Sequence, residues 1–214
     1  MLLNSYQSLI CNLPYLDQAF ETKRTTWRRE CVKHRGFSIF CDKVFGGGSL
    51  VLSRRDLFSS AEREFQGGLF SIILWGYPRN MRGNSFQTIL NSIPKIERLL
   101  SIDRQLNAGQ FMDLCERLNG TGVGLSTLSK VLYFFRFTIE GKNCLIMDKR
   151  IVDVINSKMF FELSAINKIT DFNRNRSYLA YLSEMEKIAE ANLYKPDQLE
   201  LFLFLFGKNL KTDS

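Results

Sequence analysis

A glycine-rich stretch between two amphipathic segments constrains the fold more than any other feature. The stretch LNGTGVGLSTLSKVLYFF, residues 118–135, has glycine at three alternate positions and then an apolar pattern typical of a buried helix. The preceding NAGQFMDLCERL predicts a short amphipathic helix, because its apolar residues fall at i, i+3, i+4 and i+7 (Phe111, Leu114, Cys115, Leu118). The chain must therefore turn sharply between two helices, at a point where glycines let another group approach the backbone.

Nucleotide-binding loops fit this stretch poorly. A P-loop requires GxxxxGK[ST] after a strand, but Lys130 lies six residues beyond Gly124 and a helix precedes the turn. A dinucleotide fingerprint requires GxGxxG inside a βαβ unit, and the flanks here are helical. Two interpretations remain: a plain helix–turn–helix corner, and a helix-hairpin-helix, whose G-h-G turn directs backbone N–H groups at a DNA phosphate.

The helix-hairpin-helix interpretation assigns phosphate contacts to the turn. Gly122, Val123 and Gly124 form the turn itself, with Val123 directed inward and Gly120 just before it. Lys130, on the following helix, is close enough to add positive charge. Such contacts hold a duplex without reading its sequence.

The rest of the chain predicts a mostly helical protein. Apolar residues recur at helical spacing, strand signals are few, and residues 1–35 are also interpreted as helical. Pro94 should kink or split the helical segment after Ser85. The expected class is all-α, with one short β hairpin allowed near residues 37–52.

Charge and cysteine usage limit the environment and the cofactors. A net charge of +7 favours polyanion binding only if the basic residues cluster. No apolar run reaches the roughly 18–20 residues that cross a bilayer, so we expect a cytoplasmic protein without membrane contact. The five cysteines lack a CxxC pair; Cys31, His34 and Cys41 form a conceivable zinc set without a fourth ligand, and buried thiols are the simpler interpretation.

The residues after the hairpin carry a family resemblance. The segment 118–155 ends in LIMDKRIVDVI and resembles the signature of helix-hairpin-helix DNA glycosylases: L-P-G-h-G, a helix, a loop, and an apolar pair before an aspartate, here Asp148. Upstream, SIILWGYPRNMRGNSFQTILNSI is similar to the buried helix and DNA-inserting loop of 8-oxoguanine glycosylases, and PDQLELFLFLFG is similar to their closing helix. Three features depart from the pattern: Asn119 replaces the usual proline, a Gly-Thr pair is inserted, and the loop before Asp148 is long.

The resemblance implies a two-lobed fold and a mechanism. One lobe would comprise residues 1–62 plus 151–214, and the other residues 63–150 with the hairpin. Asp148 would stabilise the oxocarbenium character of the sugar as the base leaves; the alternative is a plain helix N-cap. Ser126 occupies the position of the nucleophilic lysine of bifunctional members, which implies a monofunctional enzyme that leaves an abasic site.

Base flipping would use the loop YPRNMRGN, residues 77–84. Tyr77 or Met81 could act as a wedge, and the orphaned base and phosphates would be contacted by four polar residues (Arg79, Asn80, Arg82, Asn84). A solvated basic loop is the alternative. Aromatic candidates for the base pocket are Trp75, Tyr77, Phe204 and Phe206, although any one phenylalanine among 18 is more often core.

The predicted substrate is a base in double-stranded DNA. An 8-oxoguanine-type lesion and a hypermodified cytosine of phage DNA, for example a glucosylated one removed in antiviral defence, fit equally well. Two other classes stay open: a non-catalytic helix-hairpin-helix DNA-binding module, and a basic helical adaptor for acidic proteins. We expect a bacterial protein with no obligatory protein partner, no organic cofactor and no iron–sulfur cluster. The hairpin carbonyls of Leu118, Gly120 and Val123 could bind one K⁺ or Na⁺.

Overall fold

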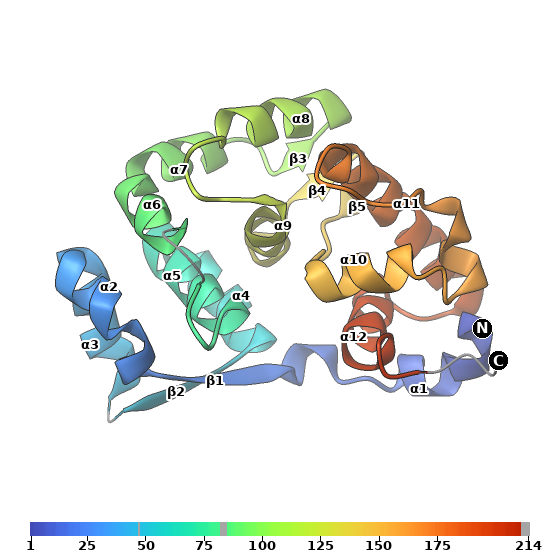
Figure 1. The fold of residues 1–214 in the computed structure, drawn as a ribbon, viewed down its shortest axis with the longest axis horizontal. Coiled ribbons are helices and arrows are strands. Elements are labelled where there is room, and N and C mark those ends of the chain that lie inside the picture. Colours follow the sequence, from blue (N-terminus) through green and yellow to red (C-terminus); the bar gives the residue numbers. More distant parts are fainter. Residues whose placement is uncertain (47, 82–84, 211–214) are drawn as a thin grey trace.

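The computed structural model describes residues 1–46, 48–81 and 85–210, and helices make up most of it (Figure 1). The helices are α1 Gln7–Cys11, α2 Arg28–Lys33, α3 Arg35–Phe45, α4 Arg54–Arg63, α5 Phe65–Gly76, α6 Ser85–Asn91, α7 Ile93–Leu100, α8 Ala108–Arg117, α9 Leu125–Phe134, α10 Lys149–Asn156, α11 Arg174–Asn192 and α12 Pro196–Phe206. Short 3-10 turns lie at Leu3–Tyr6, Tyr15–Asp17, Arg24–Trp27 and Phe161–Ala165. The strands are β1 Ala19–Lys23, β2 Ser49–Ser53, β3 Gln105–Leu106, β4 Thr138–Ile139 and β5 Lys142–Asn143. The predicted mostly helical class is confirmed.

Helix α9 lies in the middle of the molecule (Figure 1). On one side it packs against α5, whose residues from Gly67 to Trp75 are all buried, as expected of a helix that is apolar on every face. On the other side lie α10, α11 and α12, coloured orange to red in Figure 1. The segment between α9 and α10 therefore joins the two sides of the molecule.

The chain starts and finishes on the same side. The Met1 ammonium donates a hydrogen bond to the Met159 carbonyl (2.8 Å), and α1 packs against α12. Helices α2 to α4 lie instead with α5 on the far side of α9 (Figure 1). The predicted division into lobes of residues 1–62 plus 151–214 and residues 63–150 stays a prediction.

Two local predictions are wrong. Residues 35–45, placed near a possible hairpin, form helix α3, because His34 Nδ1 caps it by accepting from the Phe37 N–H (3.1 Å) and three apolar residues repeat every fourth position (Phe37, Cys41, Phe45). Only Ser49–Ser53 is a strand, and it pairs antiparallel with β1, inside the segment predicted to be helical. The split at Pro94 is confirmed: α6 ends at Asn91, and Pro94 lies in the first turn of α7, where its missing N–H costs little.

The described residues were compared with what a metal site or a membrane-spanning helix requires. No group of three or more His, Cys, Asp or Glu side chains is placed to hold a metal ion, and the five cysteines are free. No helix in the described part of the chain is long and apolar enough to span a membrane.

Candidate active site

The hairpin joins α8 to α9 through a turn that needs glycine for two different reasons. Gly120 and Gly122 have φ of +78° and +81°, a region that disfavours other residues. A Cβ at Gly122 would also lie 2.5 Å from the Ser85 carbonyl oxygen, so the turn packs directly on the first residue of α6. Around Gly120 and Gly124, by contrast, a Cβ would meet nothing within 4 Å among the described residues. The backbone at Gly120 and Gly124 is therefore open on the side where a side chain would start.

The start of α9 is suited to hold an anion. Gly124 is its N-cap and provides no side chain to bond the first N–H groups of the helix. Those N–H groups sit at the positive end of the helix dipole. Val123 is half-buried and packs against the core, as the motif requires.

The predicted cation site stays untested, and one of its ligands is already occupied. The Leu118 carbonyl accepts hydrogen bonds from the Thr121 hydroxyl (2.6 Å) and the Thr121 N–H (3.1 Å). A carbonyl oxygen has two lone pairs, so a K⁺ or Na⁺ would have to displace one of these bonds or use only Gly120 and Val123.

Asp148 is both a helix cap and an available acid. Its Oδ1 accepts from the N–H groups of Arg150 (2.9 Å) and Ile151 (3.2 Å) at the start of α10. Its Oδ2 has no partner, and Asp148 takes part in no ion pair, within the described residues. The N-cap interpretation and the catalytic one are therefore compatible, because capping uses Oδ1 and leaves Oδ2 without a partner among the described residues.

The segment before Asp148 is anchored on two sides. The Met147 N–H donates to Ser129 Oγ on α9 (3.1 Å). Buried tyrosines of α11 donate to the neighbouring carbonyls, Tyr178 to Leu145 (2.7 Å) and Tyr181 to Ile146 (3.0 Å). Asp148 is thus fixed relative to both α9 and the C-terminal helices.

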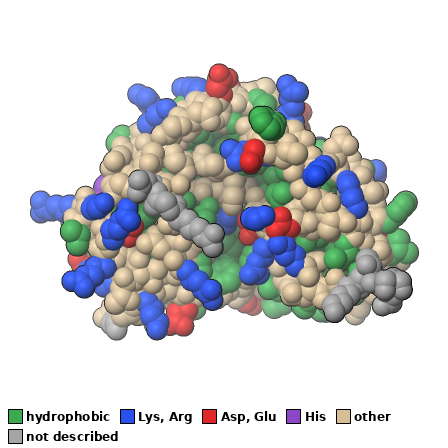
Figure 2. All heavy atoms as spheres, viewed as in Figure 1, with side chains coloured by type: hydrophobic (Ala, Val, Ile, Leu, Met, Phe, Trp, Pro, Cys, Tyr) green, Lys and Arg blue, Asp and Glu red, His purple; other side chains and the backbone are tan. Residues whose placement is uncertain are grey.

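A pocket of about 210 Å³ lies beside Asp148. It is lined by residues from β1, α4, α5, α9, α10 and α12 and from the segments that flank them: Gln18, Phe20, Arg54, Trp75, Gly76, Pro78, Lys130, Ile146, Asp148, Arg150, Glu200 and Phe204. We call it the Asp148 pocket. The space-filling view shows a face that is hollowed near its centre, with basic side chains spread around it and few acidic ones (Figure 2).

A buried ion pair forms part of the lining of the Asp148 pocket. Arg54 Nη1 lies 2.7 Å from Glu200 Oε2, and both side chains are only 1% exposed. Arg54 Nε also donates to Gln18 Oε1 (2.6 Å), while Trp75 packs on the guanidinium (5.7 Å to the ring centroid). Burial raises the pKa of Glu200 to about 6, although Arg54 opposes that shift.

Several polar atoms of this pocket lack hydrogen-bond partners within the described residues. Gln18 Nε2 has no acceptor and Glu200 Oε1 has no donor, whereas Glu200 Oε2 is held by Arg54 Nη1 at 2.7 Å. Buried polar groups are rarely left this way in a folded protein. Gln18 Nε2 and Glu200 Oε1 are thus a donor and an acceptor that a ligand could satisfy.

Lys130 lies inside the pocket and not on the outer surface of the hairpin. Its side chain is 4% exposed, and its Nζ donates to the Ser126 carbonyl (2.9 Å) and to Ser126 Oγ (3.0 Å). The Tyr77 ring lies beneath the ammonium at 5.3 Å, and Tyr77 is itself held by a hydrogen bond to Thr127 (2.7 Å). The predicted phosphate contact of Lys130 stays untested, and Lys130 lines the same pocket as Asp148.

The predicted aromatic residues separate into two groups. Trp75 and Phe204 line the pocket, and Tyr77 lies next to it under Lys130. Phe206 is not part of the lining and packs on Phe202 (5.6 Å between centroids).

The predicted DNA-inserting loop is only partly described. Arg79 is exposed, whereas Asn80 is tied inward, since its Nδ2 donates to the Thr26 carbonyl (3.0 Å) and to Glu30 Oε2 (3.2 Å). Arg82 and Asn84 lie outside the described residues. Asn80 therefore holds the loop against the 3-10 turn Arg24–Trp27. Among the predicted DNA contacts of this loop that the structure describes, Arg79 is exposed and can extend outward.

Sequence reasoning missed Gln18, Phe20, Arg54 and Glu200. One signal was available: Glu200 is the single charged residue in the apolar run LELFLFLF, and a charge in such a run is buried and needs a partner. Its partner Arg54 is far away in sequence, so no spacing rule could have found the pair.

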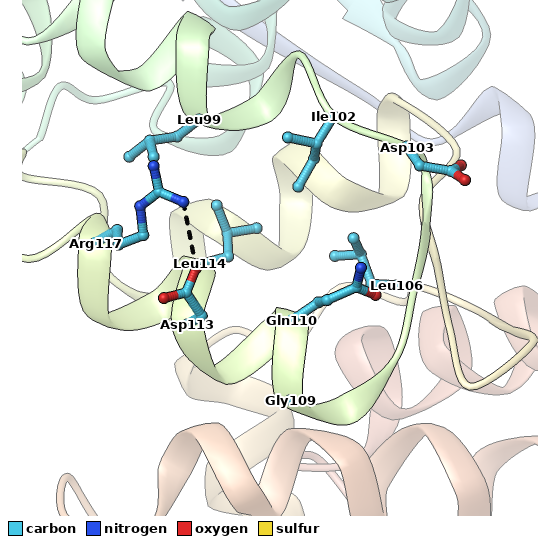
Figure 3. A pocket seen from close by; sticks show the side chains of 9 residues that line it. All are labelled: Leu99, Ile102, Asp103, Leu106, Gly109, Gln110, Asp113, Leu114 and Arg117. Carbon is cyan, nitrogen blue, oxygen red and sulfur yellow. Dashed lines mark hydrogen bonds and ion pairs between the residues drawn. The ribbon is translucent and has the colours of Figure 1, made fainter.

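A second hollow lies between α7 and α8, and no residue of its lining belongs to the Asp148 pocket (Figure 3). Its walls are mostly apolar, and Asp113 and Arg117 pair with each other across one helical turn (3.3 Å). Asp103 points away from the hollow in Figure 3. The hollow between α7 and α8 has no unpaired acid beside a buried polar wall, so the Asp148 pocket is the better candidate site.

A helix-hairpin-helix, followed by an aspartate that caps the next helix beside a polar pocket, is the arrangement expected of a helix-hairpin-helix DNA glycosylase. The family model described as "Putative 8-oxoguanine DNA glycosylase OGG-like protein" matches residues 14–204, and the chain belongs to this family. The same comparisons matched no curated protein and no solved structure. Family membership supports a DNA glycosylase in general and implies DNA as the substrate.

Proposed function

We propose that this chain excises a modified guanine from duplex DNA through Asp148. The observation that carries the proposal is the free Oδ2 of Asp148 beside a pocket with unpartnered buried polar atoms. A flipped base would enter this pocket while the hairpin holds the strand.

In this proposal Asp148 is the fixed carboxylate that N-glycosidic cleavage requires. As the base leaves, positive charge develops on the sugar, and a fixed carboxylate nearby stabilises it without reorganising. The caps to Arg150 and Ile151 hold Oδ1, which leaves Oδ2 to face the sugar or to orient a water.

The polar wall favours guanine over cytosine. The Watson–Crick edge of guanine presents two adjacent donors and one acceptor. Glu200 offers Oε1, which has no partner, next to Oε2, which has one lone pair left beside Arg54, and Gln18 offers one amide donor, so the pattern matches with a charge-assisted pair. Cytosine presents one donor and two acceptors, which this wall matches less well. The small volume of the pocket also favours a base without a sugar attached over a glucosylated cytosine of phage DNA.

Base release from defined duplexes tests the proposal. Oligonucleotides with one 8-oxoguanine, one glucosylated hydroxymethylcytosine or no modification are incubated with the wild-type protein, and free bases are measured by mass spectrometry. We expect release of the oxidised guanine by the wild type and none by Asp148→Asn. Release of the glucosylated base alone would redirect the proposal to antiviral defence. Salt-sensitive binding without base release from any duplex would favour a non-catalytic DNA-binding module. A protein that binds no DNA would favour the adaptor for acidic proteins.

The setting proposed with this function is the reducing cytoplasm of a bacterium, with double-stranded DNA as the partner. The five free cysteines support a reducing compartment. The proposed monofunctional chemistry depends on Ser126, which stands where bifunctional members carry their nucleophilic lysine.

A further inference from the structure

We propose that α2, α3 and the 3-10 turn before them form a second DNA-binding surface, which holds the backbone of the duplex beside the DNA-inserting loop. This surface is separate from the hairpin and from the Asp148 pocket, and the inference does not depend on which base is excised. We call it the basic surface and define it by four exposed side chains: Lys23, Arg28, Lys33 and Arg35.

Most of the net charge of the protein lies in this part of the chain. Between Lys23 and Lys43 the sequence has seven Lys and Arg against two acids, so this segment carries five of the seven net positive charges. Figure 2 shows several Lys and Arg side chains over the part of the molecule where Figure 1 places α2 and α3. Clustered charge of this kind, and not net charge alone, indicates a surface for a polyanion.

The acids in and near this segment leave the basic surface unneutralised. Asp42 pairs with Arg24, and Glu30 is buried, with its Oε2 accepting from Asn80 Nδ2 (3.2 Å). Glu21, on β1, is exposed and precedes the segment. The four side chains of the basic surface take part in no ion pair within the described residues. Their charges are therefore available to an external anion.

Part of the segment forms a hollow of about 420 Å³ that could receive a backbone phosphate. Its lining has two arginines, two hydroxyl side chains and no acid: Arg24, Thr25, Arg28, Cys31, Val32, Ser38 and Gly48. A guanidinium presents several N–H donors to phosphate oxygens, and hydroxyl groups commonly add further bonds to DNA phosphates. The hollow therefore combines positive charge with hydrogen-bond donors.

The basic surface is fixed relative to the DNA-inserting loop. That loop joins α5 to α6, and the ring of Phe37 in α3 packs on both helices, on Phe70 of α5 (5.2 Å between centroids) and Phe86 of α6 (4.9 Å). Trp27 packs on Phe86 as well (5.2 Å). The Asn80 amide ties the loop to the same 3-10 turn. A duplex that meets the loop would therefore lie beside the basic surface.

Duplex DNA fits the basic surface better than an acidic protein does. The family of this chain implies DNA as the substrate, and the ring contacts place these cations next to the loop expected to enter the duplex. The hairpin, at the start of α9, and the basic surface are carried by different parts of the fold (Figure 1). They would thus contact different phosphates of one duplex.

The test compares two variants that lose the same charge. The basic-surface variant carries Lys23→Gln, Arg28→Gln and Lys33→Gln, and the control carries substitutions of exposed cations on α4, α7 and α11: Arg63→Gln, Lys95→Gln and Lys187→Gln. Affinity for an unmodified duplex is measured by fluorescence anisotropy over a range of salt concentrations. Each lost phosphate contact lowers the slope of log affinity against log salt by roughly 0.9. We expect a decrease of about 2–3 for the basic-surface variant and of less than about 0.5 for the control.

A second measurement locates the contact along the duplex. Duplexes with one abasic-site analogue are shortened from either end. The wild type should lose affinity when the flank on one side is removed, and the basic-surface variant should not respond to loss of that flank. All the substituted side chains are exposed, so thermal unfolding should be unchanged; if the triple variant nevertheless unfolds, Arg28→Gln alone should lower the salt slope by roughly 0.9.

Equal losses in the two triple variants would overturn the inference, because long-range attraction would then account for the effect. So would an unchanged salt slope in the basic-surface variant, or a wild type that responds to neither flank. A variant that keeps its DNA affinity but no longer binds polyglutamate would overturn it in favour of an acidic protein partner. If the expected slopes and flank dependence are seen but no duplex releases a base, the basic surface is supported and the proposed excision alone fails.

Discussion

The hairpin and the Asp148 pocket would contact DNA through different parts of the chain. The hairpin offers backbone N–H groups at the start of α9, and its glycines contribute by having no side chain. The pocket offers buried charged side chains from six elements and the segments around them. The first can hold any strand, whereas the second can discriminate one base from another. Changes in the hairpin should therefore affect binding to every duplex, and changes in the pocket should affect catalysis or base choice.

Asp148→Asn is expected to separate the two regions most clearly, because it should abolish catalysis and leave DNA binding intact. Loss of the carboxylate should reduce base release by at least ~10³-fold, since the developing charge on the sugar loses its counter-charge. Binding to an unmodified duplex should be unchanged, because the hairpin is untouched and an amide oxygen can still cap α10. Single-turnover release and filter binding measure the two effects. Asp153→Asn, on the same helix, is the control, and equal release by both variants would contradict the role of Asp148.

Arg54→Met should cause the largest loss of stability within the pocket. It leaves Glu200 buried without its partner, and breaking a buried ion pair costs about 3–5 kcal/mol. The matched control is Arg55→Met, whose pair with Asp17 is exposed and should contribute about 0–1 kcal/mol. Chemical denaturation of both variants checks the contrast. Similar losses would mean that the pocket wall is not a buried pair in solution.

This contrast also explains what the sequence could and could not predict. The hairpin is a local feature: a helical pattern, three glycines and a second helical pattern specify it within residues 108–134. Asp148 follows in the segment LIMD, after a loop that is longer than in the family pattern. Gln18, Arg54 and Glu200 converge only after β1, α4 and α12 have packed, and β1 itself depends on pairing with β2, a contact between segments that periodicity does not reveal. The prediction from sequence therefore named the hairpin and Asp148, whose roles stay predictions, but not the buried residues that line the pocket beside Asp148.

Gly122→Ala should test whether the hairpin depends on its contact with α6. The alanine would have to adopt φ of +81° and place its Cβ 2.5 Å from the Ser85 carbonyl, so we expect a loss of about 1–3 kcal/mol in stability. DNA affinity should fall with it for every duplex. Thermal unfolding and salt-dependent binding measure these effects. A stable variant with normal binding would show that the turn tolerates a different packing.

The pH dependence of stability should separate Glu200 from the other acids. Its pKa in the folded protein is raised to about 6 from 4.5, so its contribution to stability is fully present below pH 4.5 and is lost as the pH rises through 6. The expected loss is on the order of 1–2 kcal/mol. The pKa values of Asp56 and Asp153 are lowered, which gives the opposite slope at acid pH, so the readout is the difference between wild type and Glu200→Gln. A difference that does not change between pH 4 and pH 7 would contradict the raised pKa.

The smallest expected effect is that of Gly124→Ala, and it isolates phosphate contact from folding. Gly124 has φ of −83°, and a Cβ there meets nothing within 4 Å among the described residues, so stability should hardly change. A methyl group at the start of α9 would nevertheless keep a phosphate away from the first N–H groups. The loss of one such hydrogen bond is worth about 0.5–1.5 kcal/mol of binding, alike for modified and unmodified duplexes. If affinity stays constant while Gly122→Ala weakens it, the strand does not approach the hairpin at Gly124, and the helix start is not where the phosphate binds.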